Sequence, residues 1–238
     1  MLRMPPMNAD AVLTRLRSMA NPKNVEGMAR FGINPKDTLG ISVWDLRKVA
    51  KEIGRDHGLA LALWDTGVHE ARLLAAFVDE PERVTAAQMD AWARDFDSWD
   101  VCDQACTDLF HLTRFAPAKA VAWSRRPEEF VKRGGFALMA GIAWHDKEAK
   151  DAAFAPFLEA IPREATDDRN YVKKAVSWAL RNIGKRNLAL NRKAIATARA
   201  IQKIDSRGAR WIASDALREL TGEAVQRRLR QKRPRRNL

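Results

Sequence analysis

Helix start signals recur along this 238-residue chain from one end to the other. The segments between these signals are rich in Leu, Ala, Arg, Lys and Glu, and runs of β-branched residues are short. Such residues lose little side-chain freedom in a helix, so these segments favour α-helices over strands. The pattern predicts about a dozen helices of ordinary length, joined by short loops, and no strand.

The predicted starts are marked by residues that cap or open a helix N-terminus. These residues are Asn8, Asn21 with Pro22, Ser42, Thr85, Ser98, Pro127, Asp167 or Asp168, and Ser206. Successive helix pairs take up roughly 35–45 residues, which is the range of HEAT-like repeats. We therefore expect an all-α superhelical solenoid of HEAT-like antiparallel helix pairs, with one domain over residues 1–229. Residues 230–238 are expected to form a basic, disordered tail.

The charge of the chain is strongly positive and unevenly distributed. The formal net charge is +12. Residues 70–108 hold ten acidic and three basic residues, whereas residues 169–210 hold twelve basic residues and one acidic residue. An unmixed basic region of this kind favours a polyanionic partner.

The chain carries no sign of export or membrane insertion. No stretch approaches the ~20 apolar residues that a membrane span needs. The first residues, "MLRMPPMNAD", lack the apolar core of a secretory signal. We therefore expect a cytoplasmic protein without membrane contact.

The stretch "SWDVCDQ" is the first candidate for chemistry. On a helix, Trp99, Asp103 and Cys106 share one side, because residues four apart are neighbours. A carboxylate beside a packing face costs several kcal/mol unless it is compensated. Asp103 is therefore either a capping or salt-bridged residue beside a core tryptophan, or a carboxylate kept for chemistry. The two cysteines, Cys102 and Cys106, are expected to be reduced packing thiols.

The stretch "YVKKAVSWALRNIGK" is the second candidate. Trp178 lies off the apolar stripe of this helix, in line with Lys174, Arg181 and Lys185. An aromatic ring in a basic helical face suits phosphate contacts together with stacking on a sugar or a base. Packing of the ring under the aliphatic stems of Lys and Arg is the alternative.

The stretch "EEFVKRGGFALMAG" is the third candidate. Lys132 and Arg133 precede Gly134 and Gly135, and two glycines inside a helix cost roughly 2 kcal/mol relative to alanine. Such glycines allow a close approach to the backbone, either by a neighbouring helix or by a ligand such as a phosphate.

Several other classes of site have no support in the sequence. There is no phosphate-binding or dinucleotide-binding glycine motif and no G-x-S-x-G nucleophile motif. The four histidines, His57, His69, His111 and His145, show no metal-ligand spacing, so each is expected to be a surface or capping residue. We expect no metal ion.

The three stretches, in this order, resemble the AlkD-like DNA alkylation-repair glycosylases, an all-helical family of HEAT-like repeats. The resemblance runs from "GMARFGI" through "DSWDVCDQ" to "VSWALRNIGKRN". It departs at Trp44, where the family pattern has proline. The resemblance implies that Trp99, Asp103, Arg133 and Trp178 line a basic cleft, and that no metal or organic cofactor is needed.

The implied activity is hydrolysis of the N-glycosidic bond of cationic N3- or N7-alkylated purines in duplex DNA. The DNA path is expected to be lined by basic residues on two helices: Lys132, Lys174, Arg181, Lys185 and Arg186. A monomer that associates with nucleoid DNA is expected. Two alternatives stay open, which are a non-catalytic helical-repeat binder of damaged or branched DNA and a scaffold for an acidic protein.

Overall fold

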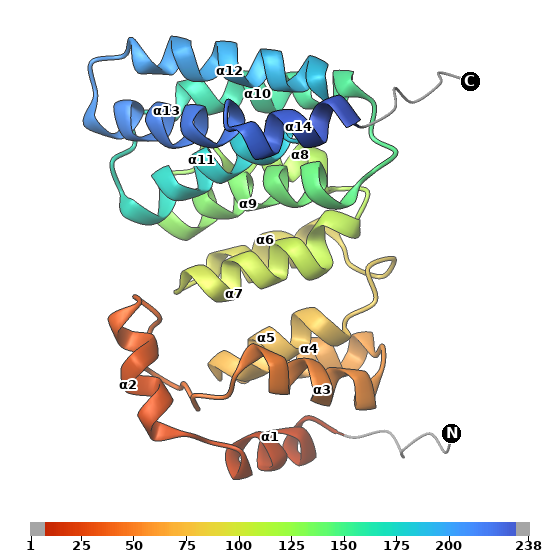
Figure 1. Cartoon of the computed structure of the whole chain (residues 1–238). Helices are drawn as coiled ribbons and strands as arrows, with labels where there is room; N and C mark the ends of the chain where they lie inside the picture. Colours follow the sequence, from red (N-terminus) through yellow and green to blue (C-terminus); the bar gives the residue numbers. More distant parts are fainter. Residues whose placement is uncertain (1–7, 232–238) are drawn as a thin grey trace. The chain divides into compact units, whose positions relative to one another are not determined.

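The described part of the protein is built from helices alone. The computed structural model describes residues 8–231 (Figure 1). That range contains fourteen α-helices, one π-helix and two 3₁₀-helices, and no strand. The all-α prediction is confirmed.

The described chain divides into two compact units. The first unit ends at Phe115 and the second begins at Ala116. The prediction of one domain over residues 1–229 stays a prediction beside this division.

The first unit holds seven α-helices within residues 8–115. In chain order they are α1 Ala9–Ser18, α2 Pro22–Arg30, α3 Val43–Ile53, α4 His57–Asp65, α5 His69–Val78, α6 Ala86–Arg94 and α7 Trp99–Gln104. The helix of α7 continues as the π-helix Ala105–Leu109 and the 3₁₀-helix Phe110–Leu112.

The predicted N-caps account for most helix starts in the first unit. The side chains of Asn8, Asn21, Ser42 and Thr85 each accept a hydrogen bond from the backbone N–H three residues further on. Each bond satisfies one of the backbone donors that a helix start leaves unpaired. Ser98 precedes α7 as predicted, although its side chain makes no capping bond.

An aromatic cluster forms much of the core of the first unit. Trp64 and Trp92 stack with their ring centroids 4.0 Å apart and nearly parallel planes. The ring of Phe96 packs against Trp64, and the ring of Phe110 packs against Trp92. Trp64 and Trp92 are therefore core residues, and their stacking adds to the free energy gained by burial.

A buried carboxylate fixes the start of α3. Glu70 on α5 is fully buried and accepts hydrogen bonds from the backbone N–H groups of Leu39, Gly40 and Ile41, at 2.8, 2.7 and 3.2 Å. Hydrogen bonds to a charged acceptor are the strong ones, so this contact holds the α2–α3 connection against α5. Gly40 has a φ of +79°, and a Cβ there would lie 2.2 Å from the carbonyl oxygen of Asn21. This position therefore requires glycine.

The second unit holds the remaining α-helices of the described chain. They are α8 Ala116–Trp123, α9 Glu129–His145, α10 Ala155–Arg163, α11 Asn170–Gly184, α12 Leu188–Gln202, α13 Arg207–Leu220 and α14 Glu223–Gln231, with the 3₁₀-helix Asp151–Phe154 before α10. Ser206 caps α13 as predicted. The starts predicted near Pro127 and Asp167 fall one to three residues later, because α9 is capped at Glu128 and α11 at Arg169.

Helix α9 is buried along most of its length, and α8 and α11 pack against it. The predicted tail over residues 230–238 is corrected at its beginning, because Arg230 and Gln231 belong to α14. Residues 232–238 lie outside the described residues.

Candidate nucleic-acid interface

Helix α7 presents the two candidate residues of the first unit. Trp99 begins the helix and is half-buried, and its indole N–H donates a hydrogen bond of 3.0 Å to the carbonyl oxygen of Phe31. Asp103 is also half-buried, and its carbonyl oxygen accepts a hydrogen bond from the hydroxyl of Thr107. This hydrogen bond uses the backbone of Asp103 and not its carboxylate.

The surroundings of Asp103 on this helix are half apolar, as predicted. Cys102 and Cys106 are both fully buried, and neither is part of a disulfide within the described residues. This confirms the expectation of reduced packing thiols. A carboxylate in such a position is partly shielded from water, which strengthens its electrostatic effect on a nearby charge.

The π-helix Ala105–Leu109 interrupts the regular spacing after Asp103. A π-helical turn contains one residue more than an α-helical turn, so residues beyond it are rotated relative to an uninterrupted α-helix. Phe110 is fully buried against Trp92. The simple four-residue spacing therefore does not describe the direction of Phe110 relative to Asp103.

A buried histidine lies beneath the first turn of α7. Nε2 of His69 lies 2.9 Å from Oδ2 of Asp100, and both side chains are buried. Burial disfavours the charged imidazole, but the hydrogen bond and charge of Asp100, with Glu70 and Asp97 nearby, outweigh it and raise the pKa of His69. The expectation that His69 is a surface or capping residue is wrong, because the sequence does not show that Asp100 reaches it.

In the second unit, Arg133 projects from α9 and is buried, with 7 % of its surface exposed. Its guanidinium donates a hydrogen bond of 2.7 Å to the carbonyl oxygen of Tyr171, at the start of α11. Arg133 therefore joins α9 to α11. Its predicted role toward a DNA phosphate stays a prediction.

The neighbouring Lys132 is neutralised by two carboxylates. Its Nζ lies 2.8 Å from Glu164 and 3.1 Å from Asp167. Burial alone would raise the pKa of Asp167, but hydrogen bonds from Arg169 and Lys132 hold that pKa at about 2. Asp167 is thus a firmly ionised partner, and Lys132 is part of an internal charge cluster.

The second of the two glycines that follow Arg133, Gly135, serves helix packing. A Cβ at Gly135 would lie 2.5 Å from the backbone nitrogen of Ser124 and 2.9 Å from the carbonyl oxygen of Ala120, both on or next to α8. Of the two interpretations of this glycine, the close approach of a neighbouring helix is confirmed.

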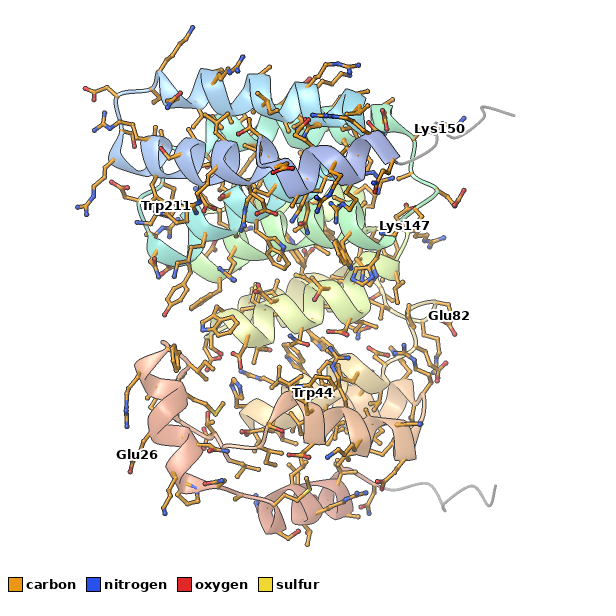
Figure 2. All side chains as sticks on the ribbon, in the orientation of Figure 1. Glu26, Trp44, Glu82, Lys147, Lys150 and Trp211 are labelled. Carbon is orange, nitrogen blue, oxygen red and sulfur yellow. The ribbon has the colours of Figure 1, made fainter. Side chains whose placement is uncertain are left out.

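A row of polar contacts joins α11 to α13, and we call it the α11–α13 ladder. It consists of the contacts Lys173–Trp211, Ser177–Asp215, Arg181–Asp215, Arg181–Glu219 and Lys185–Glu219. Arg181 and Lys185 lie 2.5 and 2.7 Å from the two carboxylate oxygens of Glu219. At the other end, the ammonium nitrogen of Lys173 lies over the ring of Trp211, 5.7 Å from the ring centroid. Trp211, on α13, is labelled in Figure 2. Burial alone would raise the pKa of Glu219, but Lys185 and Arg181 lower it.

The remaining candidates of the second unit differ in their surroundings. Arg186 donates hydrogen bonds to the carbonyl oxygens of Ala143, Asp146 and Ala149, and its guanidinium lies over the ring of Phe154. It therefore holds the C-terminal end of α9. Trp178 is half-buried.

The structure thus groups the predicted residues by unit. Trp99 and Asp103 lie together on α7 in the first unit, and the others lie on α9, α11 and the residues that follow α11 in the second unit. Of the five predicted DNA-binding residues, Lys174 alone is classed as exposed. The sequence does not show the acidic partners that follow α10 or lie on α13, nor the row of Trp44, Arg47 and Lys51 on α3.

Comparison with known proteins identifies the class. Residues 12–220 match the family model of the DNA alkylation repair enzymes. Because this match spans most of the chain, the protein belongs to that family, and the resemblance found in the sequence is confirmed. No curated protein matches the chain.

A solved structure shows the same fold. It belongs to a protein described as a member of a new family related to the HEAT-like repeat DNA glycosylases, with affinity for branched DNA structures. The two chains superpose with a TM-score of 0.72 and 18 % sequence identity, covering 90 % of this chain and 96 % of the other. The predicted HEAT-like fold is confirmed. A designed armadillo repeat protein in complex with a (KR)4 peptide aligns at a TM-score of only 0.36, with 14 % identity and coverage of 78 % of this chain and 79 % of the other.

Residues 8–231 contain no group of three or more His, Cys, Asp or Glu side chains arranged to hold a metal ion. None of the helices in this range has the length and apolar character to cross a membrane.

Proposed function

We propose that the protein is a DNA glycosylase that hydrolyses the N-glycosidic bond of cationic N3- or N7-alkylated purines in duplex DNA. The observation that carries the proposal is the half-buried Asp103 beside Trp99 on α7, next to two buried thiols. Membership of the DNA alkylation repair enzymes supports it. The predicted roles of Trp178 and Arg133, toward the deoxyribose and a flanking phosphate, are part of the same proposal.

The chemistry that such a site needs is limited. An alkylated purine that already carries a positive charge is a good leaving group, so the enzyme does not have to protonate it. The sugar develops oxocarbenium-like positive charge as the bond breaks, and a water must be placed to attack it. The carboxylate of Asp103 can oppose the developing charge and accept the proton of the water.

Substitution of Asp103 by Asn tests the proposal, because it keeps the shape and removes the charge. With 7-methylguanine-containing duplex DNA, we expect the rate of base release to fall by about 10²-fold or more. The melting temperature should stay the same or rise, because a carboxylate in half-apolar surroundings is costly. Asp65→Asn is the matched control, since Asp65 is an exposed carboxylate at the end of α4.

The outcomes separate three interpretations. Release of base at the wild-type rate by Asp103→Asn would remove Asp103 from the mechanism. A lower melting temperature, with an activity loss that follows the unfolded fraction, would make Asp103 a structural residue. Asp65→Asn should behave as the wild type in both assays.

A second candidate function is non-catalytic binding of branched or damaged DNA. The solved relative described by its affinity for branched DNA favours this candidate. It predicts that the wild-type protein binds a DNA junction and releases no base from methylated DNA. In either case we expect a monomer that acts in the cytoplasm on nucleoid DNA.

A further inference from the structure

Helix α3 exposes a tryptophan that packing does not explain. Trp44 lies in the first turn of α3, and 79 % of its surface is exposed, more than for any other large apolar side chain in residues 8–231 (Figure 2). Its ring makes no stacking or cation–π contact with the described residues. An indole left in water gives up a large part of the free energy that its burial would provide, so Trp44 is available for a ligand.

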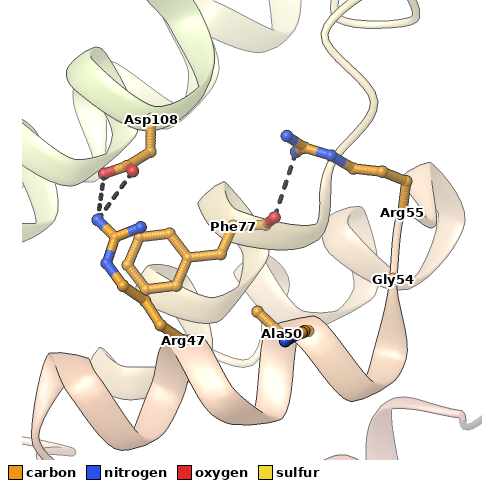
Figure 3. Close-up of a pocket in the computed structure, with 7 residues that line it drawn as sticks. Arg47, Ala50, Gly54, Arg55, Phe77 and Asp108 are labelled. Atoms are coloured by element: carbon orange, nitrogen blue, oxygen red, sulfur yellow. Dashed lines mark hydrogen bonds and ion pairs between the residues drawn. The ribbon is translucent and has the colours of Figure 1, made fainter.

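Basic residues continue along the same face of α3. Arg47 and Lys51 follow Trp44 at helical spacing, so the three side chains are neighbours in a row. Arg47 and Lys51 also line a cavity of about 350 Å³, together with Arg55 beyond the helix end (Figure 3). This volume lies in the range of small-ligand sites, which starts at about 300 Å³.

The cavity carries more positive than negative charge. Its lining holds three cations and one carboxylate, Asp108, which pairs with Arg47 at 2.8 Å. Arg55 donates to the carbonyl oxygens of Phe77 and Asp79 rather than to an acid. Lys51 is exposed and makes no ion pair within residues 8–231. The positive charge of Lys51 and Arg55 is therefore left to attract an anion.

The row is joined to the helix that carries the candidate catalytic carboxylate. The guanidinium of Arg47 lies 2.9 Å from the amide oxygen of Gln104, the residue after Asp103, and also contacts Asp108. The same guanidinium lies over the ring of Phe77, 4.4 Å from its centre. Arg47 thus fixes the row beside α7 within the first unit.

We infer that Trp44 stacks on an unpaired base of DNA while Lys51 and Arg55 bind the phosphates of the same strand. This inference rests on the proposed function for its DNA partner. The bases of an intact duplex are stacked on one another, so a protruding indole finds a free base face only where pairing is broken. Base–aromatic stacking beside cations is how proteins hold single strands. The site therefore selects DNA with unpaired bases over intact duplex.

The test compares three fluorescein-labelled DNAs of matched sequence: a single strand, a duplex and a four-way junction with an unpaired base at its centre. Binding to the full-length protein is measured by fluorescence anisotropy at one salt concentration. For Trp44→Ala we expect affinity for the single strand and the junction to fall about tenfold, and affinity for the duplex to change by less than about twofold. Trp144→Ala is the control, because Trp144 is an exposed tryptophan on α9 of the second unit.

A second variant tests the phosphate contact. Lys51→Gln should weaken binding to all three DNAs alike and should reduce the slope of log affinity against log salt by about 0.7–0.9. Because Trp44 and Lys51 are exposed, both variants should melt at the wild-type temperature, which circular dichroism checks. The inference is overturned if Trp44→Ala keeps the wild-type ratio of affinities, or if Trp144→Ala changes that ratio equally.

The inference and the proposed function fail in different ways. If the wild type releases 7-methylguanine but Trp44→Ala leaves every affinity unchanged, only the inference is wrong. If the variant loses its preference for unpaired DNA while the wild type releases no base, only the glycosylase proposal is wrong. A wild-type protein that binds none of the three DNAs overturns both.

Discussion

Replacing Gly135 by Ala adds one methyl group at the point where α8 and α9 approach each other. The new Cβ would lie 2.5 Å from the backbone nitrogen of Ser124, 2.9 Å from the carbonyl oxygen of Ala120 and 3.0 Å from Cα of Ser124. All three atoms belong to the backbone, so no side-chain rotation can relieve the contact. The two helices must instead move apart by about 1 Å to reach ordinary van der Waals distance.

The change in the free energy of unfolding caused by Gly135→Ala follows from two opposing effects. Overpacking of a close-packed site costs about 1–3 kcal/mol, and the backbone contacts at Gly135 place it near the upper end. Alanine is favoured over glycine in a helix by about 1 kcal/mol. The net loss in the free energy of unfolding is therefore about 2 kcal/mol, which corresponds to a melting temperature lower by about 4–8 °C. Thermal unfolding followed by far-ultraviolet circular dichroism, with urea unfolding as a second measurement, checks this value.

Gly27→Ala provides the matched control. Gly27 lies inside α2, and a Cβ there would have no atom within 4 Å. The same substitution should therefore leave stability unchanged or raise it by up to about 1 kcal/mol. If Gly135→Ala melts at or above the wild-type temperature, the packing account is refuted. If it also binds DNA more weakly while fully folded, the glycine serves the approach of a ligand instead.

Two further predictions concern charges. The raised pKa of His69 means that its pair with Asp100 stabilises the fold fully below the ordinary histidine pKa of about 6.5 and loses this contribution as pH rises through the raised pKa. His69→Gln should remove this part of the dependence of melting temperature on pH, and parallel curves for the two proteins would contradict it. Glu219→Gln should remove one ion-pair partner from Lys185 and from Arg181, which keeps Asp215, so that DNA affinity rises, the salt slope steepens by up to about 0.9 and the melting temperature falls. Anisotropy titrations over a series of salt concentrations measure the slope, and an unchanged slope would show that these cations do not contact DNA.

The helical fold was predictable because its signals are local. Asn8, Asn21, Ser42 and Thr85 cap helices through bonds to residues three positions away, so four adjacent residues contain the whole interaction. The family resemblance could be found in the sequence for the same reason, because its motifs are also short stretches within single helices. Helix starts shifted where the cap was not a typical capping residue, as at Arg169 before α11.

The state of the candidate DNA-binding residues was not predictable, because their partners are distant in sequence. The sequence shows twelve bases and one acid between residues 169 and 210, which suggests an unpaired basic face. In the structure, Arg181 pairs with Glu219, which lies 38 residues later, and Lys132 pairs with Glu164, which lies 32 residues later. Net charge along a segment therefore does not reveal which cations remain open to a phosphate.

The π-helix after Asp103 makes the length of that segment a constraint in its own right. Before the π-helix, Trp99 and Asp103 are set by the register of α7, and after it Phe110 is set by the core around Trp92. If this segment took up α-helical geometry at its present length, one end would rotate against the other by about 100°. Either Phe110 would then leave the core or Trp99 and Asp103 would face a new direction. The effect of a substitution in this turn therefore depends on the side chain that it changes. The effect of an insertion or deletion depends on whether Trp99 and Asp103, and also Phe110, can keep their present directions.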